Sequence, residues 1–191
     1  MKSLVFATNN KHKIEEATSI LQFTYKVVSL RELNYTGDIP ETEATLEGNA
    51  SIKAWHIFNR FGIDCFADDT GLEVDALDGA PGVYSARYAG PENDFNKNVS
   101  KLLDELQDIS DRKARFRTIV SLIINGRETQ FEGIINGTIT TERFGHNGFG
   151  YDPVFIPDGY SQTIAELDPD IKNKISHRAI ALHKMADFLG L

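Results

Sequence analysis

Cysteine is nearly absent from this sequence. Cys65 is the single cysteine among 191 residues, so the chain can form neither an internal disulfide nor a zinc or iron–sulfur site built from several cysteines. Proline is sparse at 6 residues and glycine, at 15, has an ordinary frequency, which excludes collagen-like and low-complexity classes. We therefore expect a globular protein of a reducing, cytoplasmic compartment.

Long hydrophobic runs and positive charge are scarce as well. The apolar run at residues 4–7 is too short for a signal peptide, and the run from Ile119 to Ile124 is far below the ~20 residues that cross a membrane. There are 20 Lys and Arg residues against 28 Asp and Glu, and the resulting net charge of −8 repels nucleic acid and anionic lipid. We expect a soluble protein with neither as a partner.

The length and the order of predicted elements indicate one α/β domain over residues 1–191, because a single core can serve a chain of this size. Apolar spacing and turn signals predict, in chain order, a strand at 3–7, a helix through 14–21, a strand at 26–30, a loop at 31–42, a helix at 45–61, a strand at 72–76, a helix at 94–106, strands at 114–124 and 128–139, and helices opening at 168 and 176. The Asn125-Gly126 turn makes an antiparallel hairpin of two strands, whereas the earlier strands, separated by helices, should be parallel. The sheet is therefore mixed and flanked by helices.

Cationic residues crowd two predicted helix starts, where the helix dipole disfavours them unless an anion is present. The first is the segment Thr8-Asn9-Asn10-Lys11-His12-Lys13, which is either a phosphate site or a capped helix with solvated lysines. The second has His177 and Arg178 directly after Ser176, with Lys172 and Lys174 just before. The alternative for Arg178 is a surface ion pair of little energetic weight.

An acidic segment, Asp68-Asp69-Thr70-Gly71, follows an apolar run, with Glu41 and Glu43 upstream. Neighbouring side chains of extended chain point to opposite faces, so only one of the two aspartates is expected to enter a cleft. Carboxylates suit magnesium, which takes one or two of them and completes its shell with water and phosphate oxygens. The alternative is a simple turn, for which these residue types are equally well suited.

Two further patterns are candidates for ligand contact. In Gly148-Phe149-Gly150-Tyr151-Asp152-Pro153 the glycines allow close backbone approach, and an aromatic ring can stack on a base, although a tight aromatic turn would look the same. Asn49, Lys53 and His56 form one polar edge of the helix at 45–61, which either lines a pocket or faces water.

Together these segments resemble the inosine/xanthosine triphosphate pyrophosphatases over nearly the whole chain. The motifs that carry the resemblance are residues 6–13, Glu41-Thr42 with residues 49–54, residues 67–72, residues 79–88, Gly148 to Pro153, and Ser176-His177-Arg178. The resemblance implies an elongated fold with two lobes around a central active-site cleft, a homodimer, and a magnesium-dependent reaction. That reaction hydrolyses ITP, dITP and XTP to the nucleoside monophosphate and pyrophosphate, which keeps these nucleotides out of DNA and RNA.

The resemblance also implies roles for particular residues. Asp69 would be the catalytic base and, with Glu41, a metal ligand. The other implied contacts are to the substrate. The residues implied to bind the triphosphate are Thr8, Asn9, Asn10, Lys11, His12, Lys13 and Lys53, and Thr70 would contact the substrate next to Asp69. The residues implied to surround the purine are Phe149, Gly150, Tyr151, Asp152, Lys172, His177 and Arg178. Thr70 replaces a frequent serine of the family, and Gly48 replaces a frequent carboxylate, so the metal ligands among Glu41, Glu43 and Glu47 stay open.

Chemistry compatible with these roles is an attack by water on the α-phosphorus, with no covalent intermediate. Hydrogen-bond donors from His177, Arg178 or the backbone would bind the keto oxygen of a 6-oxo purine. The amino group of adenine would instead place a donor against these donors. Two alternatives remain, a pyrophosphatase for modified pyrimidine triphosphates and a nucleotide sensor without catalysis. Substrate profiling would separate these alternatives.

Overall fold

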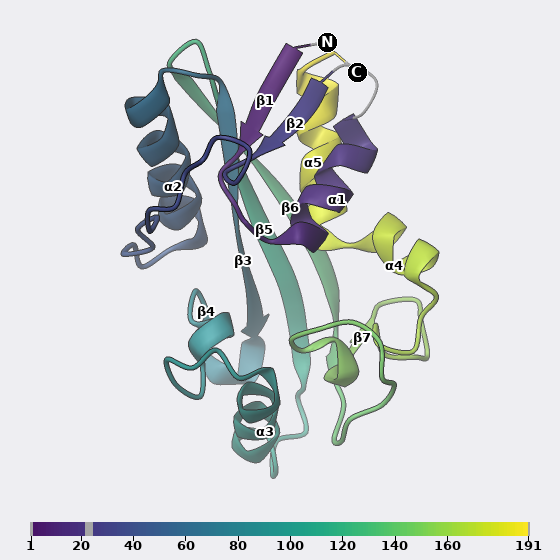
Figure 1. Ribbon diagram of the computed structural model, residues 1–191. Coiled ribbons are helices and arrows are strands. Elements are labelled where there is room, and N and C mark those ends of the chain that lie inside the picture. The colour runs from purple at the N-terminus through teal and green to yellow at the C-terminus, as the bar shows by residue number, and fades with distance from the viewer. Residues whose placement is uncertain (1, 22–24, 191) are drawn as a thin grey trace. The chain divides into compact units, whose positions relative to one another are not determined.

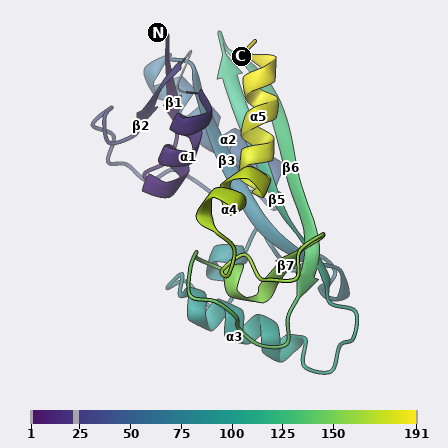
Figure 2. The ribbon, with the colours of Figure 1, turned by 90° about the vertical axis from the view of Figure 1, so that its right-hand side faces the viewer.

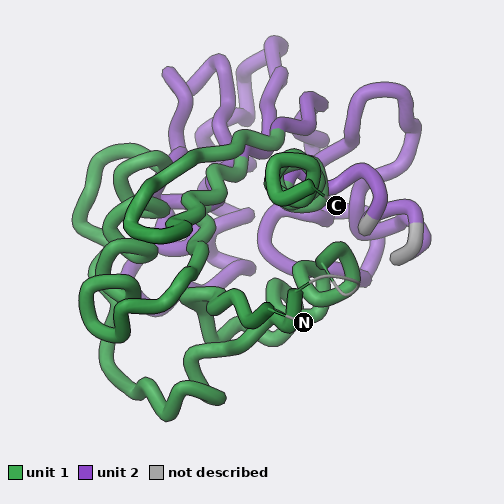
Figure 3. Tube along the Cα trace, turned by 90° about the horizontal axis from the view of Figure 1, so that it is seen from above, with its two compact units in different colours: residues 1–69, 118–133, 178–191 green, residues 70–117, 134–177 purple. Residues whose placement is uncertain are grey.

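The computed structural model describes residues 2–21 and 25–190, without the side chains of residues 169, 170 and 173. The chain forms two compact units, each assembled from segments that are distant in sequence (Figure 3). Unit 1 comprises residues 1–69, 118–133 and 178–191, and unit 2 comprises residues 70–117 and 134–177.

The described strands form one mixed sheet in the order β2-β1-β3-β5-β6-β7, with β4 paired to β3. Their bounds are Lys2–Phe6 for β1, Tyr25–Ser29 for β2, Cys65–Val74 for β3, Pro81–Gly82 for β4, Lys113–Ile124 for β5, Arg127–Ile139 for β6 and Phe155–Pro157 for β7. β1 is parallel to both β2 and β3, whereas β3–β4 and β6–β7 are antiparallel. The predicted α/β class with a mixed, helix-flanked sheet is confirmed.

In unit 1 the alternation of side chains along β1 divides the core between two helical layers. Leu4 and Phe6 belong to a cluster with α1 (Lys11–Leu21) and α5 (His177–Phe188), while Val5 and Ala7 belong to another with α2 (Leu46–Phe61). Figure 1 shows α2 on one side of the strands and α1 with α5 on the other, and Figure 2 shows α5 running alongside β5 and β6. We refer to these two sides as the α2 face and the α1/α5 face.

Unit 2 has a core of its own. Leu72 and Val74 of β3 and Phe116 of β5 pack with Leu102 of α3 (Phe95–Glu105) and with Phe155 of β7. Short 3-10 turns at Asp75–Leu77, Ser85–Arg87 and Asp152–Val154 and the helix α4 (Pro169–Ile175) complete its described elements.

Local signals predicted several elements closely. The helix predicted at 45–61 is α2, with the Thr45 hydroxyl accepting from the Gly48 N–H and Gly62 ending the helix at φ 64°. Asn125 and Gly126 both have positive φ, at 50° and 73°, as the predicted hairpin turn requires. The short strands β4 and β7 were not predicted.

The acidic segment is not a turn. β3 runs without interruption from Cys65 to Val74, so Asp68 and Asp69 lie within a ten-residue strand rather than between two strands. The turn interpretation was therefore wrong, because it considered only local residue preferences and not the partners that these carboxylates find in the folded chain.

No helix among the described residues is long and apolar enough to span a bilayer.

Gly137 on β6 tests the pairing with β7, its antiparallel neighbour. A methyl group here would meet the Ile156 carbonyl and lie 2.7 Å from the Phe155 ring. We expect Gly137→Ala to lower the free energy of unfolding by ~1–3 kcal/mol, as overpacking does. Urea denaturation would measure this, with exposed Thr138→Ala as a control that should change stability by less than ~0.5 kcal/mol. Equal stability of the two variants would contradict this packing.

Candidate functional site

Asp68 on β3 forms the centre of an ionic network on the α1/α5 face of unit 1. Its carboxylate accepts from Lys13 Nζ of α1 at 2.9 Å and from Arg178 Nε of α5 at 3.0 Å. Arg178 also donates through Nη1 to Glu16 at 3.0 Å. Asp68 and Arg178 are only 3% and 5% exposed, so this network is part of the protein interior. The weak surface ion pair considered for Arg178 is therefore wrong.

Burial alone would raise the pKa of Asp68, but the cations of Lys13, Arg178 and Lys53 overcome that effect and hold the pKa well below its usual range. Burial lowers the pKa of Lys13, and the neighbouring cations of Arg178 and Lys53 act in the same direction, against the attraction of Asp68. The network thus keeps Asp68 ionised and ties α1 and α5 to the sheet.

Asp69, one position further along β3, faces α2. The ammonium group of Lys53 on α2 donates to Asp69 Oδ1 at 2.9 Å and to Glu41 Oε1 at 2.7 Å. Lys53 is buried and the Glu41 side chain is 44% exposed, so this group reaches from the interior to the surface of unit 1. The prediction that the two aspartates point to opposite faces is confirmed by their different partners.

The three groups shift one another's pKa. Burial and the Glu41 carboxylate raise the pKa of Asp69 above its ordinary value, although Lys53 opposes them. Burial opposes the charge of Lys53, but Asp69, Asp68 and Glu41 together raise its pKa. A carboxylate with a raised pKa is a stronger base than an ordinary carboxylate.

The carboxylates of Glu41 and Asp69 lie close together, because both pair with the Lys53 ammonium, and they supply the oxygen ligands that magnesium takes. Magnesium is commonly held by one or two protein carboxylates together with substrate phosphates. The described residues contain no group of three or more His, Cys, Asp or Glu side chains placed to hold a metal ion. Glu43 is held differently, since its backbone N–H donates to Asn49 Oδ1 at 2.9 Å.

The predicted polar edge of α2 binds the loop that precedes the helix. Asn49 holds the backbone of Glu43, Lys53 holds Glu41, and His56 Nε2 lies 2.6 Å from the Tyr35 hydroxyl. The edge thus fixes the segment that carries Glu41. The two predicted alternatives, that the edge lines a pocket or faces water, did not include this role. The contribution of Tyr35 has no signal in the sequence.

The segment after β1 leads from the strand into α1. Asn10 caps the helix, since its Oδ1 accepts from the N–H groups of His12 at 3.0 Å and Lys13 at 3.3 Å. Thr8 Oγ1 in turn accepts from the Asn10 N–H, while Asn9 and Lys11 are exposed. Of the six predicted phosphate-binding residues here, Lys13 is the one that joins the Asp68 network.

In unit 2, Asp152 organises the predicted aromatic turn. Its Oδ2 accepts from the Phe149 N–H at 2.8 Å and from Lys172 Nζ at 2.6 Å. Gly148 has φ of 83°, and a methyl group there would collide with the Asp152 carboxylate, so this position requires glycine. The Phe149 ring is 44% exposed and lies 4.9 Å from the Lys172 ammonium, which gives the turn an accessible aromatic face beside a cation.

The remaining predicted base contacts are arranged differently. Tyr151 is buried and donates from its hydroxyl to the Ser85 carbonyl at 2.8 Å, which leaves Phe149 as the accessible ring of the turn. Gly150 has φ of 62° and open space beside its α-carbon. His177 stacks on Phe116 with ring centroids 4.9 Å apart, and Thr70 lies half-buried in β3.

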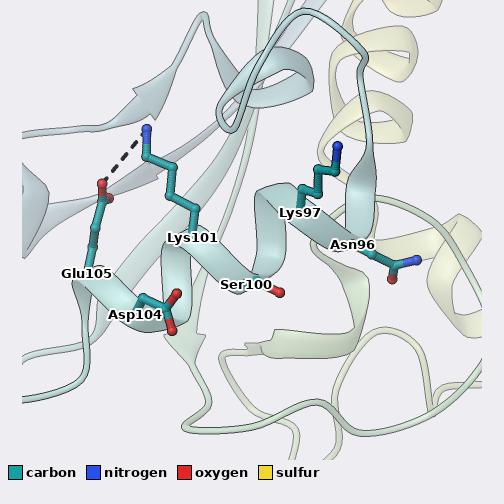
Figure 4. A pocket seen from close by; sticks show the side chains of 6 residues that line it. All are labelled: Asn96, Lys97, Ser100, Lys101, Asp104 and Glu105. Atoms are coloured by element: carbon teal, nitrogen blue, oxygen red, sulfur yellow. Dashed lines mark ion pairs between the residues drawn. The ribbon is translucent and has the colours of Figure 1, made fainter.

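A pocket on unit 2 is lined by side chains of α3 alone. Figure 4 shows them: Asn96, Lys97, Ser100, Lys101, Asp104 and Glu105, with an ion pair of 3.9 Å between Lys101 and Glu105. None of the predicted site residues contributes to this pocket. The candidate functional residues of unit 1 are therefore the two carboxylate groups of β3, and those of unit 2 form the aromatic turn.

Comparison with known proteins tests this interpretation. The model of the Ham1 family matches residues 4–188, which is nearly the whole chain. The chain belongs to the Ham1 family. Its sequence is 52% identical to a dITP/XTP pyrophosphatase of Porphyromonas gingivalis over 190 residues, covering 99% of this chain and 98% of that protein. It is 50% identical to a dITP/XTP pyrophosphatase of Flavobacterium johnsoniae, covering 97% of each.

Solved structures support the same assignment. A HAM1 protein from Coxiella burnetii is 39% identical, with a TM-score of 0.94, and the match covers 100% of this chain and 99% of that one. The Ham1 protein of Staphylococcus aureus is 38% identical, with a TM-score of 0.93, covering 99% and 98%. Membership in the Ham1 family and the fold of its members confirm the resemblance that the motifs indicated.

Asp68 offers a test of the buried network. Asp68→Asn removes the charge that two cations share, so we expect the free energy of unfolding to fall by ~3–5 kcal/mol at pH 7. Because the pKa of Asp68 is lowered in the folded state, its contribution is present above the unfolded value near ~3.9 and is lost as the pH falls below it. The difference from the parent protein should therefore shrink in urea denaturation at pH 3.

Asp158→Asn, at an exposed carboxylate, is the matched control and should change stability little at either pH. A stability loss in Asp68→Asn that is the same at pH 7 and pH 3 would contradict the ionic role of Asp68.

Proposed function

We propose that this Ham1 family protein hydrolyses non-canonical purine nucleoside triphosphates, namely ITP, dITP and XTP, to the nucleoside monophosphate and pyrophosphate. The observation that carries the proposal is the buried Lys53 ammonium, shared by the carboxylates of Asp69 and Glu41. The names of the relatives, dITP/XTP pyrophosphatase, support the same substrate class. Removal of these nucleotides from the pool would prevent their incorporation into DNA and RNA.

In this proposal Asp69 is the catalytic base. Its carboxylate accepts a proton from a water molecule whose oxygen forms a bond to the α-phosphorus, and the bond from that phosphorus to the bridging oxygen breaks to release pyrophosphate. The raised pKa of Asp69 favours proton uptake, and no covalent intermediate is needed. Lys53, which donates to Asp69, would offset charge that develops on the leaving group.

The triphosphate would be bound by the segment after β1 and by the lysines of unit 1. Lys11 is exposed at the start of α1, and Lys13 is held by Asp68. Thr8, Asn9, Asn10 and His12 would contribute polar groups at the same helix start, where backbone N–H groups favour anions.

Glu41 and Asp69 would hold a magnesium ion together with the substrate phosphates. Such an ion supplies Lewis-acid stabilisation of the phosphate charge. The two carboxylates lie close together, because both accept from the Lys53 ammonium, which supports the choice of this pair.

The purine would be recognised by the aromatic turn of unit 2. Phe149 offers an exposed ring for stacking, with Gly150, Tyr151, Asp152 and Lys172 shaping its surroundings. His177 and Arg178 were predicted as donors to the 6-oxo group. Because the Arg178 guanidinium is held by Asp68 and Glu16, we propose that it acts mainly by holding Asp68, and that Lys172 and His177 are the side chains that contact the base. We further propose that the protein is a cytoplasmic homodimer.

A substrate panel tests the reaction. Pyrophosphate release from ITP, dITP and XTP should require magnesium and exceed release from ATP, GTP and dTTP by at least ~100-fold, because several unpaired donors at ~1–3 kcal/mol each would oppose the wrong base. Release measured with and without EDTA provides the metal control. Release from none of the six would favour a nucleotide sensor, and preference for a pyrimidine would favour the other pyrophosphatase class.

Asp69→Asn separates binding from catalysis. The amide keeps the shape of the side chain but cannot accept the proton, so we expect pyrophosphate release to fall by ~100- to 10,000-fold while dITP still binds. Initial rates and isothermal titration calorimetry would measure the two effects. An active Asp69→Asn variant would disprove the role assigned to Asp69.

A further inference from the structure

Glu128 on β6 lies within unit 1, on the α2 face of the sheet, and takes no part in the chemistry proposed above. Its carboxylate accepts four hydrogen bonds, two at each oxygen. Oε2 accepts from α2, from Ser51 Oγ at 3.1 Å and Trp55 Nε1 at 2.7 Å. Oε1 accepts from the sheet, from Ser121 Oγ at 2.7 Å and Gln130 Nε2 at 3.0 Å. One carboxylate thus joins the helix to two strands.

The four hydrogen bonds stabilise the ionised form of the Glu128 carboxylate. Burial opposes the charge of Glu128, but the donors from Ser121, Trp55, Ser51 and Gln130 together hold the pKa of the carboxyl below its usual range. An ionised acceptor with four donors is expected to hold its neighbours more firmly than neutral hydrogen bonds would. The Gln130 amide extends the connection, since Nε2 also donates to the Glu47 carbonyl at 3.1 Å in the first turn of α2.

Helix geometry connects these bonds to the candidate site. Ser51 and Trp55 are four residues apart, so they share one flank of α2, whereas Lys53 shares the other flank with Asn49 and His56. Between the two flanks, the buried face consists of Leu46, Ala50, Ala54 and Ile57. Beside the small side chains of Ala50 and Ala54, the bonds from Ser51 and Trp55 to Glu128 hold this flank of the helix to the sheet.

We propose that Glu128 is a positioning residue, whose carboxylate fixes the rotation of α2 and thereby the point at which the Lys53 ammonium meets Asp69 and the substrate phosphates. The inference rests on the proposed function. The Lys53 ammonium lies at the end of a long side chain. A small rotation of the helix therefore moves this group by a distance that is large on the scale of a hydrogen bond. Misplacement by ~1 Å can reduce a rate by ~100-fold.

A double-mutant cycle tests this role. We expect Glu128→Ala to lower kcat/KM for magnesium-dependent pyrophosphate release from dITP by ~10-fold or more, mainly through kcat, because Lys53 acts on charge that develops in the transition state. In the Lys53→Ala background the same change should cost less than ~2-fold, since the group that Glu128 positions is gone. Glu128→Gln keeps the volume and one acceptor oxygen, and should lose only ~2- to 3-fold.

Leu122→Ala is the matched stability control. Leu122 is next to Ser121 on β5 but is buried in the cluster of the α1/α5 face. We expect it to lower the thermal midpoint at least as much as Glu128→Ala does, while kcat/KM stays within ~2-fold of the parent. If Glu128→Ala does not fold, Trp55→Phe removes one donor to the same carboxylate, and its loss of kcat/KM should likewise disappear in the Lys53→Ala background.

The outcomes are distinct. Equal fold-losses in the two backgrounds, or an equal loss of kcat/KM in Leu122→Ala, would overturn the positioning role and leave the proposed function standing. A folded parent protein that releases no pyrophosphate from dITP with magnesium would overturn the proposed function and the inference together.

Discussion

Two neighbouring carboxylates on one extended strand organise unit 1, because consecutive side chains of a strand point to opposite faces. Asp68 is held by cations from α1 and α5, and Asp69 by the cation of α2. Burying these charges is tolerable only while each has its partners. The bonds that attach the helices to the sheet are therefore the same bonds that assemble the candidate site, and neither can be altered without the other.

Much of this architecture follows from short-range signals in the sequence. The cap at Thr45 and the stop at Gly62 define α2, and Asn125-Gly126 defines the hairpin, because each depends on the conformation of a few consecutive residues. The opposite orientation of the two aspartates follows from strand geometry alone. The continuity of β3 does not, since Asp68 to Gly71 has the composition of a turn but lies in a strand that pairs with distant strands and whose aspartates are held by distant cations.

The candidate site was predictable in its motifs but not in its pairings. Cations at the starts of α1 and α5 predicted a bound phosphate, and in the folded chain Lys13 and Arg178 pair with Asp68 of the chain itself. Arg178 and Asp68 are far apart in sequence, so no local pattern predicts their contact. Glu128 was missed for the same reason, because its donors come from α2, β5 and β6.

The discontinuity of unit 1 has a consequence for synthesis on the ribosome. Its hydrophobic cluster combines Leu4 and Phe6 of β1 with Leu182 and Met185 of α5. The partners of β1 in α5 are thus translated long after β1 itself, and domains tend to fold as units once their parts are available. Until α5 has emerged, the nascent chain exposes the apolar side of β1 and leaves Asp68 without its guanidinium, so unit 1 can reach its native packing only after α5 has been translated.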